Sequence, residues 1–132
     1  MILVIQVPPQ RGPNDCAISC LSGISGQSYE RTLLAFGDDL AHGAQMRQVK
    51  AAARRLGLHL TLKRKIDLEQ DTGLLAIRSK KWKTDHLVVL NGGCVLDTDG
   101  STWFDPDLFL TTHDAKVLSL LVPDESRERA TR

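Results

Sequence analysis

Residues 44–63 read AQMRQVKAAARRLGLHLTLK, and the periodicity of the sequence changes within this stretch. Up to Leu56 the apolar residues recur at helical spacing among good helix formers, and Gly57 provides a stop, which predicts a helix over residues 44–56. From Leu58 apolar and polar residues alternate, which predicts a strand. The chain therefore divides into a helical first half and a β-rich second half, the order typical of an α+β fold.

The first half carries signals for two further helices. Asn14 or Asp15 can cap a helix over about residues 16–23, in which apolar residues recur at helical spacing. Ser28 can cap a second helix over residues 29–36, which ends before a glycine. With the helix that precedes the change in periodicity, we expect three helices.

Several apolar runs predict further strands. Those in the second half are residues 74–77, 86–90, 94–97 and 116–122. Asn91-Gly92-Gly93 is the strongest turn signal in the chain, so the runs on either side of it are expected to form a hairpin. Residues 2–7 are also β-rich, but Pro8-Pro9 follows them, which limits them to a short edge or entry strand. The second half is therefore predicted to be an antiparallel sheet.

The composition describes one globular domain that needs no covalent or metal support. Of the 132 residues 42% are apolar, which is enough for a single core over residues 1–123. Residues 124–132 are charged and have almost nothing to bury, so we expect a disordered tail. The 3 cysteines match neither a disulfide framework nor a zinc-binding spacing. We therefore expect no metal, no other cofactor and a reducing, cytoplasmic location.

Charge and hydropathy argue against two classes of partner. The chain has 17 basic and 16 acidic residues, and this net charge of +1 argues against a dedicated nucleic-acid binder. Residues 1–7 are apolar, but no basic segment precedes them and the prolines end them far short of a signal core or a membrane span. Neither nucleic-acid binding nor membrane insertion is expected.

Cys16 is the candidate nucleophile because it lies in the first turn of a predicted helix. The thiolate is the reactive form of cysteine, and the N–H groups and macrodipole at a helix N-terminus favour a negative sulfur. The neighbouring Asp15 opposes that charge, so a cationic histidine partner is required. His86 is the best candidate because it opens a strand after the polar, basic loop 79–85. The other histidines show no partner pattern and are His42, His59 and His113.

Asp97 is the candidate acid that orients the imidazole. In a hairpin with a two-residue Asn91-Gly92 turn, His86 lies opposite Asp97, close enough for the carboxylate to fix the tautomer of the ring. A Gly92-Gly93 turn would instead place Asp99 opposite His86. Asp97 is favoured and Asp99 stays an alternative.

Gln10 is the candidate donor to the negative oxygen that develops when a carbonyl is attacked. It lies six residues before Cys16, in a turn that contains three prolines, and its side-chain amide can act together with the backbone N–H of Cys16. Trp82, in the loop before His86, could form part of a substrate wall.

These residues and their order resemble those of the papain-like cysteine peptidases. The closer resemblance is to the bacterial branch that removes double-glycine leaders from bacteriocin precursors, and it covers roughly residues 8–107. Residues 14–21 (NDCAISCL) resemble the nucleophile helix of that branch, and residues 43–58 resemble the helix that follows it. The resemblance implies a papain-like α+β fold, with N-terminal helices packed on a C-terminal antiparallel sheet. It also implies that Gln10, Cys16, His86 and Asp97 serve as oxyanion donor, nucleophile, base and orienting acid.

The sequence departs from the pattern of this branch at two positions. Ala17 follows the nucleophile, where glycine is usual. The orienting aspartate is often followed by proline, yet Asp97 precedes Thr98, whereas Asp105 precedes Pro106. Asp105 is therefore a second alternative for the acid.

The function expected from these residues is thiol-dependent hydrolysis, as by a cysteine peptidase that cleaves a peptide or protein substrate through a covalent thioester. A related acyltransferase or deamidase would use the same residues. The alternative from another class is a catalytically silent papain-like module that binds a peptide in the same cleft.

Overall fold

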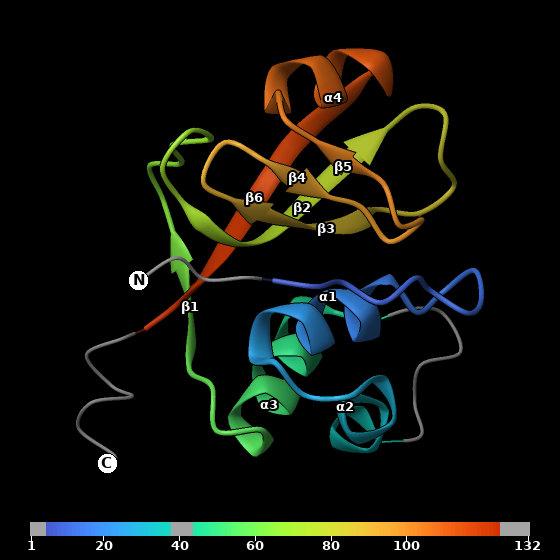
Figure 1. The fold of residues 1–132 in the computed structure, drawn as a ribbon, viewed down its shortest axis with the longest axis vertical. Helices are drawn as coiled ribbons and strands as arrows, with labels where there is room; N and C mark the ends of the chain where they lie inside the picture. The colour runs from blue at the N-terminus through green and yellow to red at the C-terminus, as the bar shows by residue number, and fades with distance from the viewer. Residues whose placement is uncertain (1–4, 38–43, 125–132) are drawn as a thin grey trace.

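The computed structural model describes residues 5–37 and 44–124, and within them the chain is an α+β protein. Three helices, α1 (Cys16–Ser25), α2 (Tyr29–Phe36) and α3 (Met46–Arg55), form one layer below a sheet, and α4 (Pro106–Thr112) lies on the other side of it (Figure 1). The strands are β1 (Leu60–Lys63), β2 (Thr72–Ser79), β3 (His86–Asn91), β4 (Val95–Leu96), β5 (Thr102–Trp103) and β6 (Ala115–Pro123).

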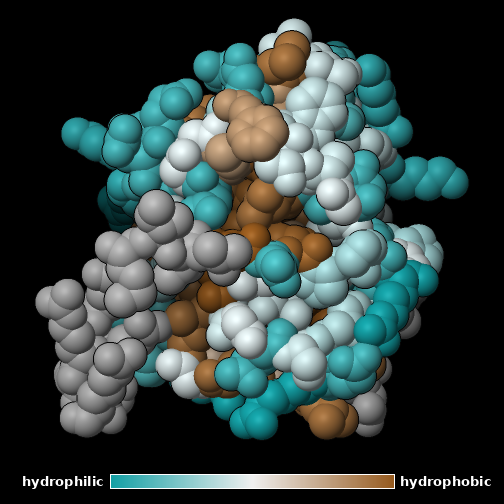
Figure 2. Space-filling model, in the orientation of Figure 1, coloured by the Kyte–Doolittle hydropathy of each residue, from teal (hydrophilic) through white to brown (hydrophobic). Residues whose placement is uncertain are grey.

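The six strands form one antiparallel sheet in the order β1-β6-β2-β3-β4-β5. The last strand in the sequence, β6, therefore lies inside the sheet, between β1 and β2. The sheet has apolar clusters on both faces, as the alternation of side chains along β3 shows. Leu87 and Val89 pack in the cluster that contains the helices α1 to α3, whereas Val88 and Leu90 pack with Phe109 of α4. Figure 2 shows the apolar side chains gathered between the helical layer and the sheet.

The helix ends follow from local sequence. The hydroxyl of Ser28 accepts a hydrogen bond from the backbone N–H of Arg31 at 3.1 Å, which caps α2 as expected. Gly37 ends this helix with a φ of 81°, a conformation that glycine adopts without strain. A capping box between Gln45 and Gln48 opens α3, two residues later than the sequence predicts.

Gly73 of β2 is required by the close approach of β6. A Cβ atom placed on Gly73 would lie 2.2 Å from the carbonyl oxygen of Leu121, which is backbone in the middle of the sheet. Gly73→Ala should therefore lower the free energy of unfolding by about 2 kcal/mol, through overpacking. Urea denaturation measures this change. Gly12→Ala is the matched control, because its Cβ would meet its nearest neighbour, Asp15 Oδ1, at 3.8 Å. Equal stability of the two variants would contradict the assignment.

Several predicted elements differ from the structure. Residues 5–7 form no strand and pack instead across α1, where the lack of a side chain on Gly23 leaves room for the backbone of Val7. Neither β5 nor α4 is predicted from the sequence. The sequence predicts Cys94 within a strand, whereas β4 begins one residue later and Cys94 pairs through its backbone with Asn91 to close the turn. The expected strand residues 2–4 and the expected tail 125–132 lie outside the described residues. In the described ranges, none of the helices combines the length and apolar character needed to cross a membrane.

Candidate active site

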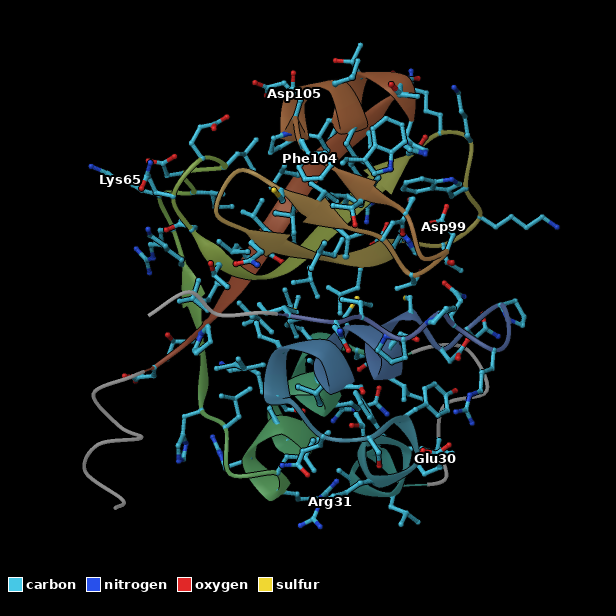
Figure 3. The ribbon with its side chains drawn as sticks, in the orientation of Figure 1. Glu30, Arg31, Lys65, Asp99, Phe104 and Asp105 are labelled. Carbon is cyan, nitrogen blue, oxygen red and sulfur yellow. The ribbon has the colours of Figure 1, made fainter. Side chains whose placement is uncertain are left out.

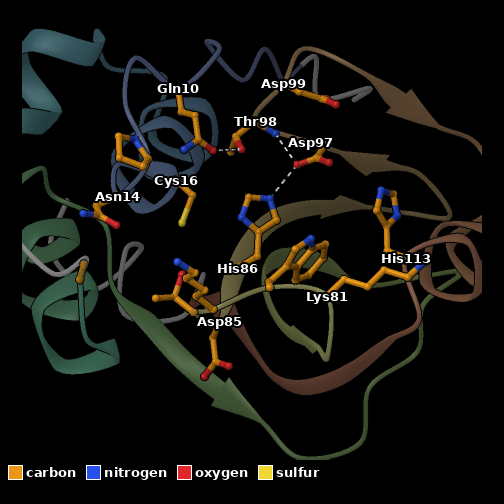
Figure 4. A pocket seen from close by; sticks show the side chains of 15 residues that line it. Gln10, Asn14, Cys16, Lys81, Asp85, His86, Asp97, Thr98, Asp99 and His113 are labelled. Carbon is orange, nitrogen blue, oxygen red and sulfur yellow. Dashed lines mark hydrogen bonds and ion pairs between the residues drawn. The ribbon is translucent and has the colours of Figure 1, made fainter.

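The four residues singled out from the sequence line one cleft of about 590 Å³. Gln10 comes from the loop before α1, Cys16 from the start of α1, His86 from the start of β3 and Asp97 from the segment after β4. Figure 4 shows the four side chains pointing toward one another. The fold brings them together because α1 and β3 pack against each other and begin at the same side of the molecule, on the right in Figure 1.

Cys16 is the first residue of α1, and its side chain is only partly buried. The carbonyl of Asp15 accepts hydrogen bonds from the N–H groups of Ile18 and Ser19, so the helix begins with Cys16. The first N–H groups of a helix have no carbonyl partner within it, which places donors and the positive end of the macrodipole at this sulfur. Cys20 is fully buried, its thiol donates to the carbonyl of Leu87, and burial raises its pKa well above the usual range. Cys16 is therefore the accessible thiol of this helix.

The sequence offers Asp15 as a cap for α1, and Asp15 does hold the N-cap position. Its carboxylate, however, makes no capping hydrogen bond to the helix. It turns back to the preceding loop, where it accepts from the N–H groups of Arg11 at 2.7 Å and Gly12 at 2.9 Å and from the hydroxyl of Tyr29 at 2.7 Å. Burial opposes ionisation, but the hydrogen bonds from Tyr29 and the two N–H groups lower the pKa of Asp15 below its ordinary value. The negative charge of Asp15 is therefore stabilised by hydrogen bonds from Tyr29 and from the loop between Gln10 and Cys16, and these bonds hold that loop in place.

A second set of contacts fixes the same loop to α2. The guanidinium of Arg11 lies 3.9 Å above the ring of Tyr29 and pairs with Glu30 at 2.8 Å. The loop is therefore held by its own acid and by the first turn of the next helix.

His86 and Asp97 form a partly buried pair. Nε2 of His86 lies 2.8 Å from Oδ1 of Asp97, and the two side chains are 21% and 11% exposed. The other ring nitrogen is turned toward the sulfur of Cys16 (Figure 4). Burial would lower the pKa of His86, but the hydrogen bond with Asp97 and the interaction with Cys16 outweigh it and raise the pKa to about 9. Burial would raise the pKa of Asp97, and the hydrogen bond with His86 outweighs this and lowers it.

The hairpin register predicted from the sequence is wrong, although the contact that it predicts is present. Leu90 pairs with Val95, so the turn residues are Gly92 and Gly93 rather than Asn91 and Gly92. This is the alternative register, which would place Asp99 directly opposite His86 if pairing continued.

Pairing does not continue, because β4 ends at Leu96. Asp97 starts a turn in which its carbonyl accepts from the N–H of Gly100 at 3.2 Å. Asp97 lies two residues before Asp99 and hence on the same face, so it reaches His86 as a diagonal neighbour. Asp99 is occupied elsewhere, since its carboxylate accepts from the N–H and the hydroxyl of Ser101 at 2.8 and 2.5 Å.

Asp105 has a separate structural role. It is the N-cap of α4, where its carboxylate accepts from the N–H of Leu108 at 3.2 Å and Pro106 occupies the first turn. Figure 3 places it beside α4, away from the end of the molecule where Asp99 lies. The Asp-Pro pair that made Asp105 an alternative for the acid is thus a helix start.

The side chain of Gln10 is held at both ends of its amide. Nε2 donates to the carbonyl of Gly12 at 2.5 Å, and Oε1 accepts from the hydroxyl of Thr98 at 2.5 Å. Because a backbone carbonyl can only accept, the contact with Gly12 identifies the nitrogen of the amide. An amide nitrogen has two N–H donors, so one remains for a ligand in the cleft.

The aromatic wall of the cleft consists of Trp82 and His113. The Trp82 ring centroid lies 5.3 Å from that of His86 and 5.8 Å from that of His113. His113 Nδ1 contacts the carbonyl of Phe109 at 2.9 Å, which holds this ring against α4. The sequence predicts Trp82 near the site but gives no signal for His113 or Thr98, which lie far from Cys16 in the sequence and carry no motif.

Direct titration of His86 tests the electrostatics of the pair. Its ring resonances in NMR should titrate near pH 9, and Asp97→Asn should lower this pKa because the variant removes the negative partner of the imidazolium. Asp99→Asn is the control, and it should leave the titration unchanged because Asp99 bonds to Ser101. An equal fall in both variants would show that general charge, rather than the hydrogen bond, sets the pKa.

Across residues 5–37 and 44–124, no group of three or more His, Cys, Asp or Glu side chains is arranged to hold a metal ion. The cleft itself is lined by a thiol, an imidazole, a carboxylate and an amide, those of Cys16, His86, Asp97 and Gln10. No model of a known protein family matches the chain, and no curated protein sequence is significantly similar to it.

Proposed function

We propose that the protein is a thiol-dependent hydrolase of the papain-like type, most simply a cysteine peptidase. The observation that carries this proposal is the convergence in one cleft of a helix N-terminal thiol, an imidazole bonded to a carboxylate and an oriented amide. A structural role for these four side chains does not require them to share an open cleft.

In the proposed reaction the Cys16 thiolate attacks the carbonyl carbon of an amide bond, and the electron pair of the C=O bond moves to the oxygen. Nε2 of Gln10 and the backbone N–H of Cys16 donate to this oxyanion. When the C–N bond breaks, the imidazolium of His86 gives its proton to the departing nitrogen, which leaves a thioester. Asp97 keeps the ring oriented through Nε2 throughout.

The second half of the reaction restores the enzyme. Neutral His86 takes a proton from a water molecule, whose oxygen attacks the thioester carbon, and the sulfur leaves as thiolate. Water as the second nucleophile gives hydrolysis. An amine in its place gives acyl transfer, and a glutamine side-chain amide as the first substrate gives deamidation.

The thioester is the species to detect. The wild-type protein, incubated with p-nitrophenyl acetate, should release p-nitrophenolate in a burst and carry an acetyl group on Cys16, located by peptide mass spectrometry. Cys16→Ser should lose both signals. Cys20 is an internal control, since it is fully buried and should stay unmodified.

A peptide mixture then defines the reaction class. Cleavage creates new peptide ends that depend on Cys16, whereas deamidation converts glutamine to glutamate without cleavage. Absence of acylation on Cys16 would contradict the proposed function. Retention of peptides by such an unreactive protein would favour the silent binding module instead.

A further inference from the structure

Thr98 connects the loop that carries Gln10 to the pair formed by His86 and Asp97. It is only 2% exposed, and it follows Asp97 directly in the sequence. Its backbone N–H donates to Oδ1 of Asp97 at 2.7 Å, the same oxygen that contacts His86. Its hydroxyl donates to Oε1 of Gln10 at 2.5 Å, and its carbonyl accepts from the N–H of Gln10 at 2.8 Å. Figure 4 shows Thr98 between Gln10 and Asp97.

The hydroxyl decides which way the Gln10 amide faces. Oε1 is the acceptor end of the amide and needs a donor, which Thr98 supplies. Without that donor, the oxygen would be left in a partly buried position without a hydrogen bond, and the amide could turn its oxygen toward the cleft. An oxygen facing a developing oxyanion would repel it rather than stabilise it.

We infer that Thr98 is a positioning residue that orients Gln10 as the oxyanion donor, while its backbone holds the acid that orients His86. This inference rests on the proposed function. It assigns the hydroxyl and the backbone of one residue to different parts of the site. The hydroxyl acts on the Gln10 amide, and the N–H acts on Asp97.

The two assignments can be separated because a substitution can remove the hydroxyl and keep the N–H. Acylation by p-nitrophenyl acetate passes through an oxyanion, whereas alkylation by iodoacetamide displaces iodide without one. Thr98→Val should therefore slow acylation of Cys16 by about tenfold, the worth of one lost hydrogen bond, and leave its alkylation rate and pH profile unchanged. Thr98→Ser keeps a hydroxyl and should restore acylation.

Controls distinguish positioning from damage to the fold. Thr111→Val makes the same change at an exposed site on α4 and should have no effect on acylation. Protection of the buried Cys20 from iodoacetamide reports that each variant is folded. If valine does not fit, Thr98→Ala removes the same hydroxyl without added volume. In a Gln10→Ala background, Thr98→Val should cause no further loss.

The outcomes separate this inference from the proposed function. If the wild-type protein is not acylated at Cys16, the proposed function fails. If it is acylated and Thr98→Val is acylated equally fast, the function stands and the role of Thr98 is overturned. Additive losses in the double variant, or equal losses in acylation and alkylation, would also overturn it.

Discussion

Gln10→Ala should slow the acylation of Cys16 by p-nitrophenyl acetate about 100-fold or more, which is the usual cost of removing one oxyanion donor. The physical reason is that the amide is oriented before the reaction, with its oxygen held by Thr98 and its nitrogen by Gly12. Such a group stabilises the new charge without having to reorganise. Alkylation of the same sulfur by iodoacetamide should change little. The ratio of the two second-order rate constants is the measurement.

Gln6→Ala is the matched control for this prediction. Gln6 lies four residues upstream, is exposed and does not line the cleft of Cys16. Its removal should leave both rate constants unchanged. If Gln10→Ala slows alkylation as much as acylation, the amide acts on the sulfur or on the loop, and the role as oxyanion donor is wrong.

His86→Ala should lower the rate of Cys16 alkylation at pH 6.5 by up to about 100-fold, because a free cysteine is only about 1% thiolate at that pH. In the wild-type protein the imidazole is still cationic at pH 6.5, since the pKa of His86 is raised to about 9, and the proposed reaction uses this positive charge beside the sulfur of Cys16. The sign follows from the raised pKa: imidazolium is present below about pH 9 and is lost above it. The difference between wild type and variant should therefore narrow as the pH rises toward 9.

The measurement is the alkylation rate between pH 5 and 9, followed by mass spectrometry of each cysteine peptide. Cys94, which is partly exposed and does not line the cleft, is the internal reference and should react alike in both proteins. Equal rates for Cys16 in wild type and variant at low pH would show that the imidazole does not hold the sulfur as an anion.

The helical half of the fold could be predicted because its signals are local. Ser28 caps α2 and Gly37 ends it, both visible in the sequence as a capping residue and a stop. The sheet order could not be predicted, since nothing local shows that β6 inserts between β1 and β2. Asp105-Pro106 is a strong signal for a helix start, but the resemblance favours it as an alternative for the orienting acid, and no helix is predicted there from the sequence.

The contact between His86 and Asp97 was predicted from a wrong register. If the register of this hairpin is extended beyond Leu96, the direct and the diagonal positions opposite His86 are both aspartates, so a shift of two positions still leaves an acid on the same face. What selects Asp97 is the end of β4 at Leu96 and the turn that follows, which depend on tertiary packing. The orientation of the Gln10 amide also depends on tertiary structure, because its partner Thr98 lies 88 positions away in the sequence.

The interior position of β6 has a consequence for synthesis of the protein. Residues 115–123 form β6 and are synthesised after every other described element. Because β6 lies between β1 and β2 and pairs with both, those two strands are not joined in the sheet until β6 inserts. Helix α1, which carries Cys16, can form early because its residues are close in sequence, but the sheet that carries His86 is complete only once residues 115–123 are available. A chain that ends before residue 115 therefore contains both Cys16 and His86 but lacks the strand that joins β1 to β2 in the sheet.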